Sequence, residues 1–309
     1  MGLRLLQSAN GSTGNLMLTL PRGKYRRLII HVNGTNASGV TFLPTDVYFT
    51  LERGGNKVSM NMQDLMNNNN FDGGFPTATS TANSTLNLFA SYDCFLSGDK
   101  NNVFLAGIDD SRVQITWQNT AKISTGSVSV YAEYGQGTES YIVRWKNFST
   151  TLPGSAGSQV TQNLSDQNIT RLYFRTASDI GHLSVKRDDV EVVASNGTAL
   201  AALAAYDGKA EAAVSFIVAD LSGSRTPADV VSNSLSFTIT QATGSTATEM
   251  PAYMQTIEIN SAKMQESATQ LSLNNAIAGQ TYPPIRQVQI IHGTIVGQQN
   301  NSGGTQNDL

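Results

Sequence analysis

The chain has 309 residues, of which only 14% are charged, and its formal net charge is −3. This length suits one large domain or two of ordinary size, while the weak charge excludes both a broad phosphate-binding surface and a highly charged disordered chain. Asn, Ser, Thr and Gly occupy positions that Lys and Glu usually hold, so neighbouring molecules can cover the surface without desolvating many charges.

The first residues, MGLRLLQSANGS, contain no long apolar run and predict no secretory signal. Leu6 stands where a myristoylation signal needs Ser or Thr. No stretch approaches 18 apolar residues, so we predict no transmembrane helix. We therefore expect a chain that is made and used without a secretory route.

A basic segment, PRGKYRR at residues 21–27, holds Arg22, Lys24, Arg26 and Arg27. One interpretation is a basic patch that faces an anionic membrane or a nucleic acid. The alternative, which we favour, is a solvated turn that enters a strand.

Apolar and polar residues alternate with a period of two along most of the chain. In the segment RVQITWQ, for example, Val113, Ile115 and Trp117 share one face. This pattern is typical of half-buried strands in antiparallel sheets, and it places Trp117 in a core. The same pattern predicts strands at residues 28–32, 46–52, 112–118, 127–133, 214–220 and 235–241.

A hairpin followed by a short helix is predicted in the first half of the chain. In residues 49–60, Arg53 and Gly54-Gly55 separate two strand-like runs, and NMQDLMNN at 61–68 has a helical composition. Three methionines, Met60, Met62 and Met66, are expected to fill gaps under this helix or between domains.

The chain carries one cysteine, Cys94, so an intrachain disulfide is excluded. Its flanks, SYDCFL, predict a half-buried strand with a core thiol. A catalytic cysteine needs a histidine partner, and His31, His182 and His292 are scattered along the sequence. No acid–base pair, nucleophile triad, zinc spacing or nucleotide loop stands out, so we predict that the chain is not an enzyme.

Two pairs of adjacent carboxylates, Asp109-Asp110 and Asp188-Asp189, raise the question of a calcium site. Calcium needs six to eight oxygen ligands, and neither pair has EF-hand spacing. We expect hairpin-turn residues with local Asx hydrogen bonds. Structural calcium is possible, and the sequence does not identify its ligands.

The second half of the chain repeats the order of the first. Residues 183–194 form a second hairpin around Arg187 and Asp188-Asp189, and 196–208 predict a second helix. The remaining equivalences pair GLRLLQS with SYIVRWKNFS, YRRLIIHV with ITRLYFRT, RVQITWQNT with SLSFTITQAT, and SVSVYAEY with YMQTIEIN. Six features therefore recur in one order, at offsets of roughly 120 to 145 residues, which indicates two similar domains.

These observations predict an all-β chain of two tandem eight-stranded jelly rolls with short helices in loops. An immunoglobulin-like sandwich would be shorter and would lack the helix inside the domain. We place the first jelly roll at 1–137, the second at 138–262, and a flexible glycine-containing hinge at 134–140. A C-terminal extension, 263–309, is expected to contribute one strand at RQVQIIHG and to end in a mobile segment.

This layout resembles the double jelly-roll major capsid proteins of icosahedral viruses, including bacteriophages with an internal membrane. The resemblance covers residues 1–262 and rests on strand order, the repeated hairpin with its helix, and the Asn/Thr-rich composition, because the lineage has no short diagnostic motif. The compact length is most similar to the small-coat branch with short loops, rather than to the long-towered adenovirus type.

The resemblance implies a structural function. In that family two barrels stand side by side, roughly normal to the shell, and three chains form a pseudo-hexagonal capsomer. The expected partners are further copies of the chain, minor capsid, penton or membrane-associated virion proteins, and an internal viral membrane. The expected location is the virion shell, with host cytoplasm during assembly. The alternative function is a virion spike, fibre or carbohydrate-binding protein built of tandem β-sandwiches.

Overall fold

The computed structural model describes residues 2–10, 14–53, 56–72, 85–96, 102–106, 111–117, 122–196, 199–200, 216–221, 234–259, 287–291 and 294–298. Asp109-Asp110, Gly54-Gly55 and most of the helix predicted at 196–208 lie outside these residues. Most of the extension 263–309 also lies outside them.

The first barrel, called barrel 1, is built from two antiparallel sheets. Sheet 1a has the strand order β1-β9-β3-β6, with β7 added beside β3, and sheet 1b has the order β2-β8-β4-β5. The strands of barrel 1 are β1 (Gly2–Asn10), β2 (Asn15–Thr19), β3 (Gly23–Asn36), β4 (Val47–Arg53), β5 (Asn56–Asn61), β6 (Thr85–Asp93), β7 (Phe104–Ala106), β8 (Arg112–Trp117) and β9 (Ile123–Tyr134).

The second barrel, called barrel 2, is built in the same way. Sheet 2a has the order β10-β17-β12-β15, and sheet 2b has the order β11-β16-β13-β14. Its strands are β10 (Tyr141–Thr151), β11 (Gln159–Leu164), β12 (Ile169–Phe174), β13 (Ile180–Arg187), β14 (Val190–Ser195), β15 (Ile217–Asp220), β16 (Leu235–Gln241) and β17 (Glu249–Ile259).

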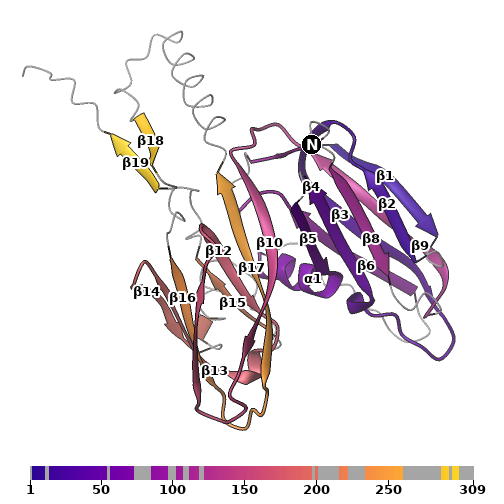
Figure 1. The fold of residues 1–309 in the computed structure, drawn as a ribbon. Coiled ribbons are helices and arrows are strands. Elements are labelled where there is room, and N and C mark those ends of the chain that lie inside the picture. The colour runs from indigo at the N-terminus through magenta and orange to yellow at the C-terminus, as the bar shows by residue number, and fades with distance from the viewer. Residues whose placement is uncertain are drawn as a thin grey trace, which may run out of the picture.

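The two barrels share one topology. When the extra strand β7 is set aside, each barrel pairs its first strand with its last, its last with its third, and its third with its sixth, while the other four form the facing sheet. Eight antiparallel strands in two packed sheets of this order form a jelly roll. The predicted fold class is therefore confirmed, and Figure 1 shows the two barrels side by side.

The strand order also tests the equivalences drawn from the sequence. The first strands, third strands, hairpins, seventh core strands and last strands of the two halves occupy matching places in the two barrels. The sixth equivalence, between the two helices, rests partly on residues outside the described part of the chain. Five equivalences are thus confirmed by topology.

Helical structure in the described residues lies in the connections between strands. The helix α1 (Met62–Phe71) follows β5, and its N-cap residue Asn61 accepts a hydrogen bond from the amide of Asp64 at 2.8 Å. Two short 3-10 helices occupy Pro44–Asp46 and Ala177–Asp179. Within the described ranges, no helix has the length and apolar character needed to cross a membrane.

The turn between β13 and β14 explains why two aspartates stand together there. Asp188 and Asp189 have φ angles of 47° and 65°, the left-handed region that a type I′ hairpin turn requires at both central positions. The hairpin prediction is therefore confirmed. The Asp188 carboxylate accepts hydrogen bonds from the amide and the hydroxyl of Ser234, so its bonding reaches beyond the local Asx contacts that we expected.

Apolar side chains form two clusters. The cluster in barrel 1 contains Trp117 and Cys94, as predicted, although Cys94 lies just after the end of β6 rather than within a strand. Burial raises the pKa of the Cys94 thiol, which suits a packing role. The second cluster fills barrel 2.

The C-terminal extension differs from the expectation of one added strand. β18 (Gln287–Ile291) and β19 (Thr294–Gln298) pair with each other as a separate two-stranded antiparallel sheet. Figure 1 draws this hairpin apart from the sheets of both barrels.

Candidate functional site at the interface between the two barrels

The centre of sheet 2a is buried on both of its faces. All six residues of β12 are buried, whereas a half-buried strand would alternate. One face of the sheet belongs to the core of barrel 2. The other face carries Tyr173, Tyr253 and Trp145, which join the apolar cluster of barrel 1. The helix α1 lies between the two barrels in Figure 1.

The central polar contact of this interface is the side chain of Arg171. Its guanidinium donates to both carboxylate oxygens of Asp72 at 2.9 Å and to Oδ1 of Asn68 at 2.6 Å. It also pairs with Asp220 on the neighbouring strand at 3.4 Å and lies 5.1 Å from the ring centroid of Phe71.

The surroundings of Arg171 keep it charged. The side chain is only 3% exposed, and burial alone would lower its pKa. Asp72 and Asp220 outweigh this effect and hold the pKa above its ordinary value. A bidentate guanidinium–carboxylate pair between α1 and β12 therefore fixes the two barrels in one orientation.

A second polar cluster surrounds Asp64 near the start of α1. The Asp64 carboxylate accepts hydrogen bonds from the hydroxyls of Tyr253 at 2.7 Å and Tyr173 at 3.4 Å, both from barrel 2. Arg175 approaches it at 3.4 Å. Burial raises the pKa of Asp64, although the tyrosine hydrogen bonds and Arg175 act in the opposite direction.

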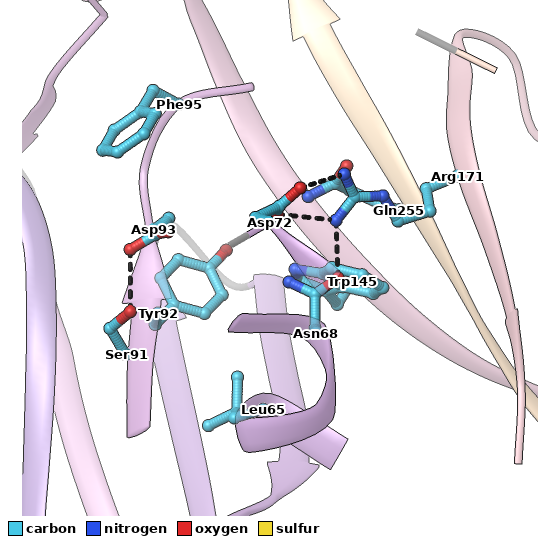
Figure 2. Close-up of a pocket in the computed structure, with 10 residues that line it drawn as sticks. All are labelled: Leu65, Asn68, Asp72, Ser91, Tyr92, Asp93, Phe95, Trp145, Arg171 and Gln255. Atoms are coloured by element: carbon cyan, nitrogen blue, oxygen red, sulfur yellow. Dashed lines mark hydrogen bonds and ion pairs between the residues drawn. The ribbon is translucent and has the colours of Figure 1, made fainter. Parts of the chain in front are cut away.

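A small polar pocket opens at the same interface. Figure 2 shows Asp72 and Arg171 joined by dashed lines on one side and Asp93 with Ser91 on the other, with Trp145 and Phe95 among the other lining residues. Among the residues that the structure describes, no group of three or more His, Cys, Asp and Glu side chains could hold a metal ion.

The segment that connects the barrels is held by a buried glutamate. Glu139, itself 3% exposed, accepts two hydrogen bonds from Arg53 at 2.6 and 3.2 Å and one from the amide of Leu105 at 3.0 Å. The Arg53 guanidinium also lies 4.8 Å from the centroid of Phe104. A charged pair that is buried away from water needs several hydrogen-bond partners. Here Arg53 and Leu105, the partners of Glu139, both belong to barrel 1, so they hold the connector against that barrel.

Asn102 makes a similar connection through its side-chain amide. Its Nδ2 donates to the carbonyls of Cys94 and Tyr141, and its Oδ1 accepts from the amides of Ser140 and Tyr141. Because this one side chain satisfies backbone groups of both barrels, it fixes the start of β10. Tyr92 reinforces the contact by donating to the carbonyl of Val143 at 2.7 Å.

The two glycines predicted a flexible hinge here, and the structure shows hydrogen bonds between this connector and barrel 1. The amide of Gly135 donates to the carbonyl of Lys24, and the Lys24 ammonium donates to the carbonyl of Gly137. A Cβ at Gly135 would lie 2.2 Å from Arg26, so glycine is required there by close packing. Gly137 has a φ of 151°, which a residue with a Cβ rarely adopts.

The structure separates the four residues of the predicted basic patch. Arg22 and Lys24 are exposed. Arg26 lies at a β-bulge between Tyr25 and Arg27, is 7% exposed and pairs with Glu133 at 3.4 Å. Arg27 is half-buried and pairs with both Asp93 and Glu133.

The residues that make the interface were not singled out from the sequence. Arg171, Asp72, Glu139 and Asn102 stand far apart along the chain, and no local pattern joins them. One signal was present: ITRLYF at 169–174 has no alternation of apolar and polar residues, which is typical of a strand buried on both faces.

Comparison with known proteins gives structural matches alone. No protein-family model matches the sequence, and no curated protein is similar to it in sequence.

Several solved structures share the fold over most of the chain. The major capsid protein of the virus STIV matches with a TM-score of 0.65 and 15% identity, covering 85% of this chain and 98% of that one. A chain in the atomic structure of Sulfolobus Turreted Icosahedral Virus matches with a TM-score of 0.65 and 14% identity, covering 90% and 97%. The major capsid protein P2 of bacteriophage PM2 matches with a TM-score of 0.61 and 13% identity, covering 84% and 98%. These matches establish a shared double jelly-roll fold.

Replacing Arg171 tests the central contact. We expect Arg171→Met to lower the free energy of unfolding by about 3–5 kcal/mol, because it leaves Asp72 and Asp220 buried without their cation. Arg144→Met is the matched control, since its partner Glu258 is 60% exposed, and it should cost less than about 1 kcal/mol. Urea denaturation of both variants makes the measurement. Equal losses would contradict the central role of Arg171.

The raised pKa of Asp64 predicts a pH dependence. The folded state binds the Asp64 proton more tightly than the unfolded state, whose carboxyl titrates near 3.8. The contribution to stability is therefore largest below that value and is lost as pH rises through the folded pKa. We expect Asp64→Asn to remove this contribution, so that its unfolding free energy relative to that of wild type increases as the pH rises from 4 to 7. Urea titrations between pH 4 and 7 measure both slopes, and identical slopes would disprove the assignment.

Proposed function

We propose that this chain is a major capsid protein that forms trimeric, pseudo-hexagonal capsomers and tiles an icosahedral virion shell. The observation that carries the proposal is the pair of barrels with one topology, locked together by buried charged contacts. The shared fold with viral coat proteins, over 97–98% of their chains, supports it.

Two similar barrels in one chain suit a capsomer of this kind for a geometric reason. A chain with two similar barrels supplies two corners of a hexagon, so three chains supply six with one repeated set of contacts. Closed symmetry within the capsomer limits runaway association. Contacts within an obligate trimer are expected to bury on the order of 2,000 Å² or more, whereas contacts between capsomers are smaller and more polar. A surface with few charges suits both kinds of contact.

We also propose the finer assignment to the compact, short-loop branch found in bacteriophages with an internal membrane. Support comes from the match to the coat protein of bacteriophage PM2, although the viral protein of STIV matches as well. The proposed partners are further copies of the chain and minor, penton or membrane-associated virion proteins. The proposed locations are the virion shell and, during assembly, the host cytoplasm.

The domain limits remain part of the proposal. We place the first jelly roll at 1–137, the second at 138–262 and an extension at 263–309. Support for the first limit comes from the end of β9 at Tyr134 and the start of β10 at Tyr141. Support for the second comes from the end of β17 at Ile259.

The oligomeric state tests the proposed function. We expect the purified chain to form a species of three times its 33.0 kDa mass, or larger particles, because a single copy offers only two of six corners. Light scattering after size-exclusion chromatography measures the mass, and electron microscopy detects shells. A monomer at every concentration, with no particles, would refute the proposal.

For the basic segment, the solvated turn stays the interpretation that we favour. As the alternative, we propose that its exposed part, Arg22 and Lys24, faces an anionic membrane. Arg22→Ala/Lys24→Ala should weaken binding to phosphatidylserine vesicles by about 1 kcal/mol for each charge, and more so at low salt. Lys57→Ala/Lys186→Ala removes two other exposed charges and serves as the control. Equal binding by the two variants contradicts the proposal, and loss of DNA binding alone would assign the segment to nucleic acid.

A further inference from the structure

Two carboxyl groups line the pocket between the barrels from opposite sides. Asp72 follows α1 and Asp93 ends β6, and Figure 2 shows both among the lining residues, together with Trp145 and Phe95. Their side chains are 19% and 21% exposed. Two carboxylates that line one largely buried pocket disfavour each other's ionised form, so a proton on one of them is favoured.

Asp72 is the better compensated of the two groups. It accepts two hydrogen bonds from the guanidinium of Arg171 at 2.9 Å, in the bidentate geometry that stabilises a carboxylate most. Asp93 accepts a hydrogen bond from the Ser91 hydroxyl at 2.9 Å and pairs with Arg27 through the single nitrogen Nε, at 3.3 Å. Asp93 is therefore the group that takes up a proton first.

The other charged groups around this carboxyl group come from four strands. On β9, Glu133 pairs with Arg27 at 3.2 Å and with Arg26 of β3 at 3.4 Å. On β12 and β15, Arg171 and Asp220 pair with each other at 3.4 Å. Each guanidinium group in this part of the described structure thus interacts with a carboxylate other than that of Asp93.

The pKa of Asp93 reflects this arrangement. Burial raises the pKa above its ordinary value of 3.8. Arg27 and the hydrogen bond from Ser91 act in the opposite direction, whereas Asp72 and Glu133 raise the pKa further. The proton is bound most tightly while the barrels enclose the pocket, because water would otherwise solvate the ionised carboxylate.

We propose that a proton on Asp93 keeps the two barrels closed around the pocket, and that loss of this proton at higher pH lets water enter and weakens the contact between Asp72 and Arg171. The ionised group repels Asp72 across the pocket and needs hydration that the closed interface does not supply. The closed form is therefore favoured at low pH, and it loses this advantage as the pH rises through the pKa of Asp93.

This opening is a property of one chain, and only its consequence for a shell rests on the proposed function. Every subunit of such a shell carries the same carboxyl group at the same interface. A rise in pH therefore loosens all subunits together, which makes the protonation of Asp93 a means of regulating the stability of the shell.

Trp145 reports on the pocket, because its side chain lines the pocket and is 3% exposed. The second tryptophan, Trp117, lies in the core of barrel 1. We expect acrylamide quenching of the fluorescence of the full-length chain to increase at least about twofold between pH 4 and 9, because opening exposes Trp145. Trp145→Phe should show no increase, since Trp117 stays covered.

Replacing the carboxyl group tests its assignment. Asp93→Asn should remove the increase in quenching, because the amide has nearly the same shape and no proton to lose. Glu52→Gln removes an exposed carboxyl group of β4 and is the matched control, which should behave like wild type. Equal melting temperatures at pH 4 establish that both variants fold.

Two substitutions of one ion pair separate electrostatics from packing. Glu133→Gln removes a carboxylate near Asp93, so the midpoint of the increase should move to lower pH. Arg27→Gln removes the cation that favours ionised Asp93, so the midpoint should move to higher pH, by about 1 unit or more. Lost packing alone would move both midpoints in the same direction, because both variants break the same contact.

The outcomes distinguish this opening from the proposed function. Quenching that is independent of pH in wild type, a full increase in Asp93→Asn, or midpoints that move in the same direction would overturn the proton-dependent opening and leave the capsid function intact. An increase that persists in Trp145→Phe would also overturn it, because Trp117 would then report unfolding of barrel 1. A chain that opens as expected but stays monomeric would support the opening and refute the capsid function.

Discussion

A buried arginine that belongs to one barrel and is neutralised by the other is the constraint on which this molecule depends. Arg171 is 3% exposed, and a charge so removed from water is stable only with its partners in place. Two of these partners, Asp72 and Asn68, lie at the C-terminal end of α1 in barrel 1. The barrels are therefore held in one orientation by a contact that loses its stabilisation if either barrel moves.

Hydrogen bonds and ion pairs fix the relative orientation of the two barrels, which apolar packing alone does not fix. The apolar cluster that spans the interface stabilises the association of the barrels but tolerates sliding, because hydrophobic burial has no direction. Glu139 and Asn102 hold the connector through hydrogen bonds of fixed geometry. A rigid two-barrel unit is what a repeated tile needs, because an error in its angle would accumulate around a ring.

The sequence by itself determined many of the strands, the two hairpins and their order, because alternation and turn residues act over a few positions. It also placed Trp117 and Cys94 in a core. Only the tertiary structure decided which charges meet. Arg26 and Arg27 are consecutive, yet a bulge lets both pair with Glu133, and Arg171 pairs with Asp72 from 99 residues away. The partner of a buried charge depends on how sheets pack, and no local pattern records that packing.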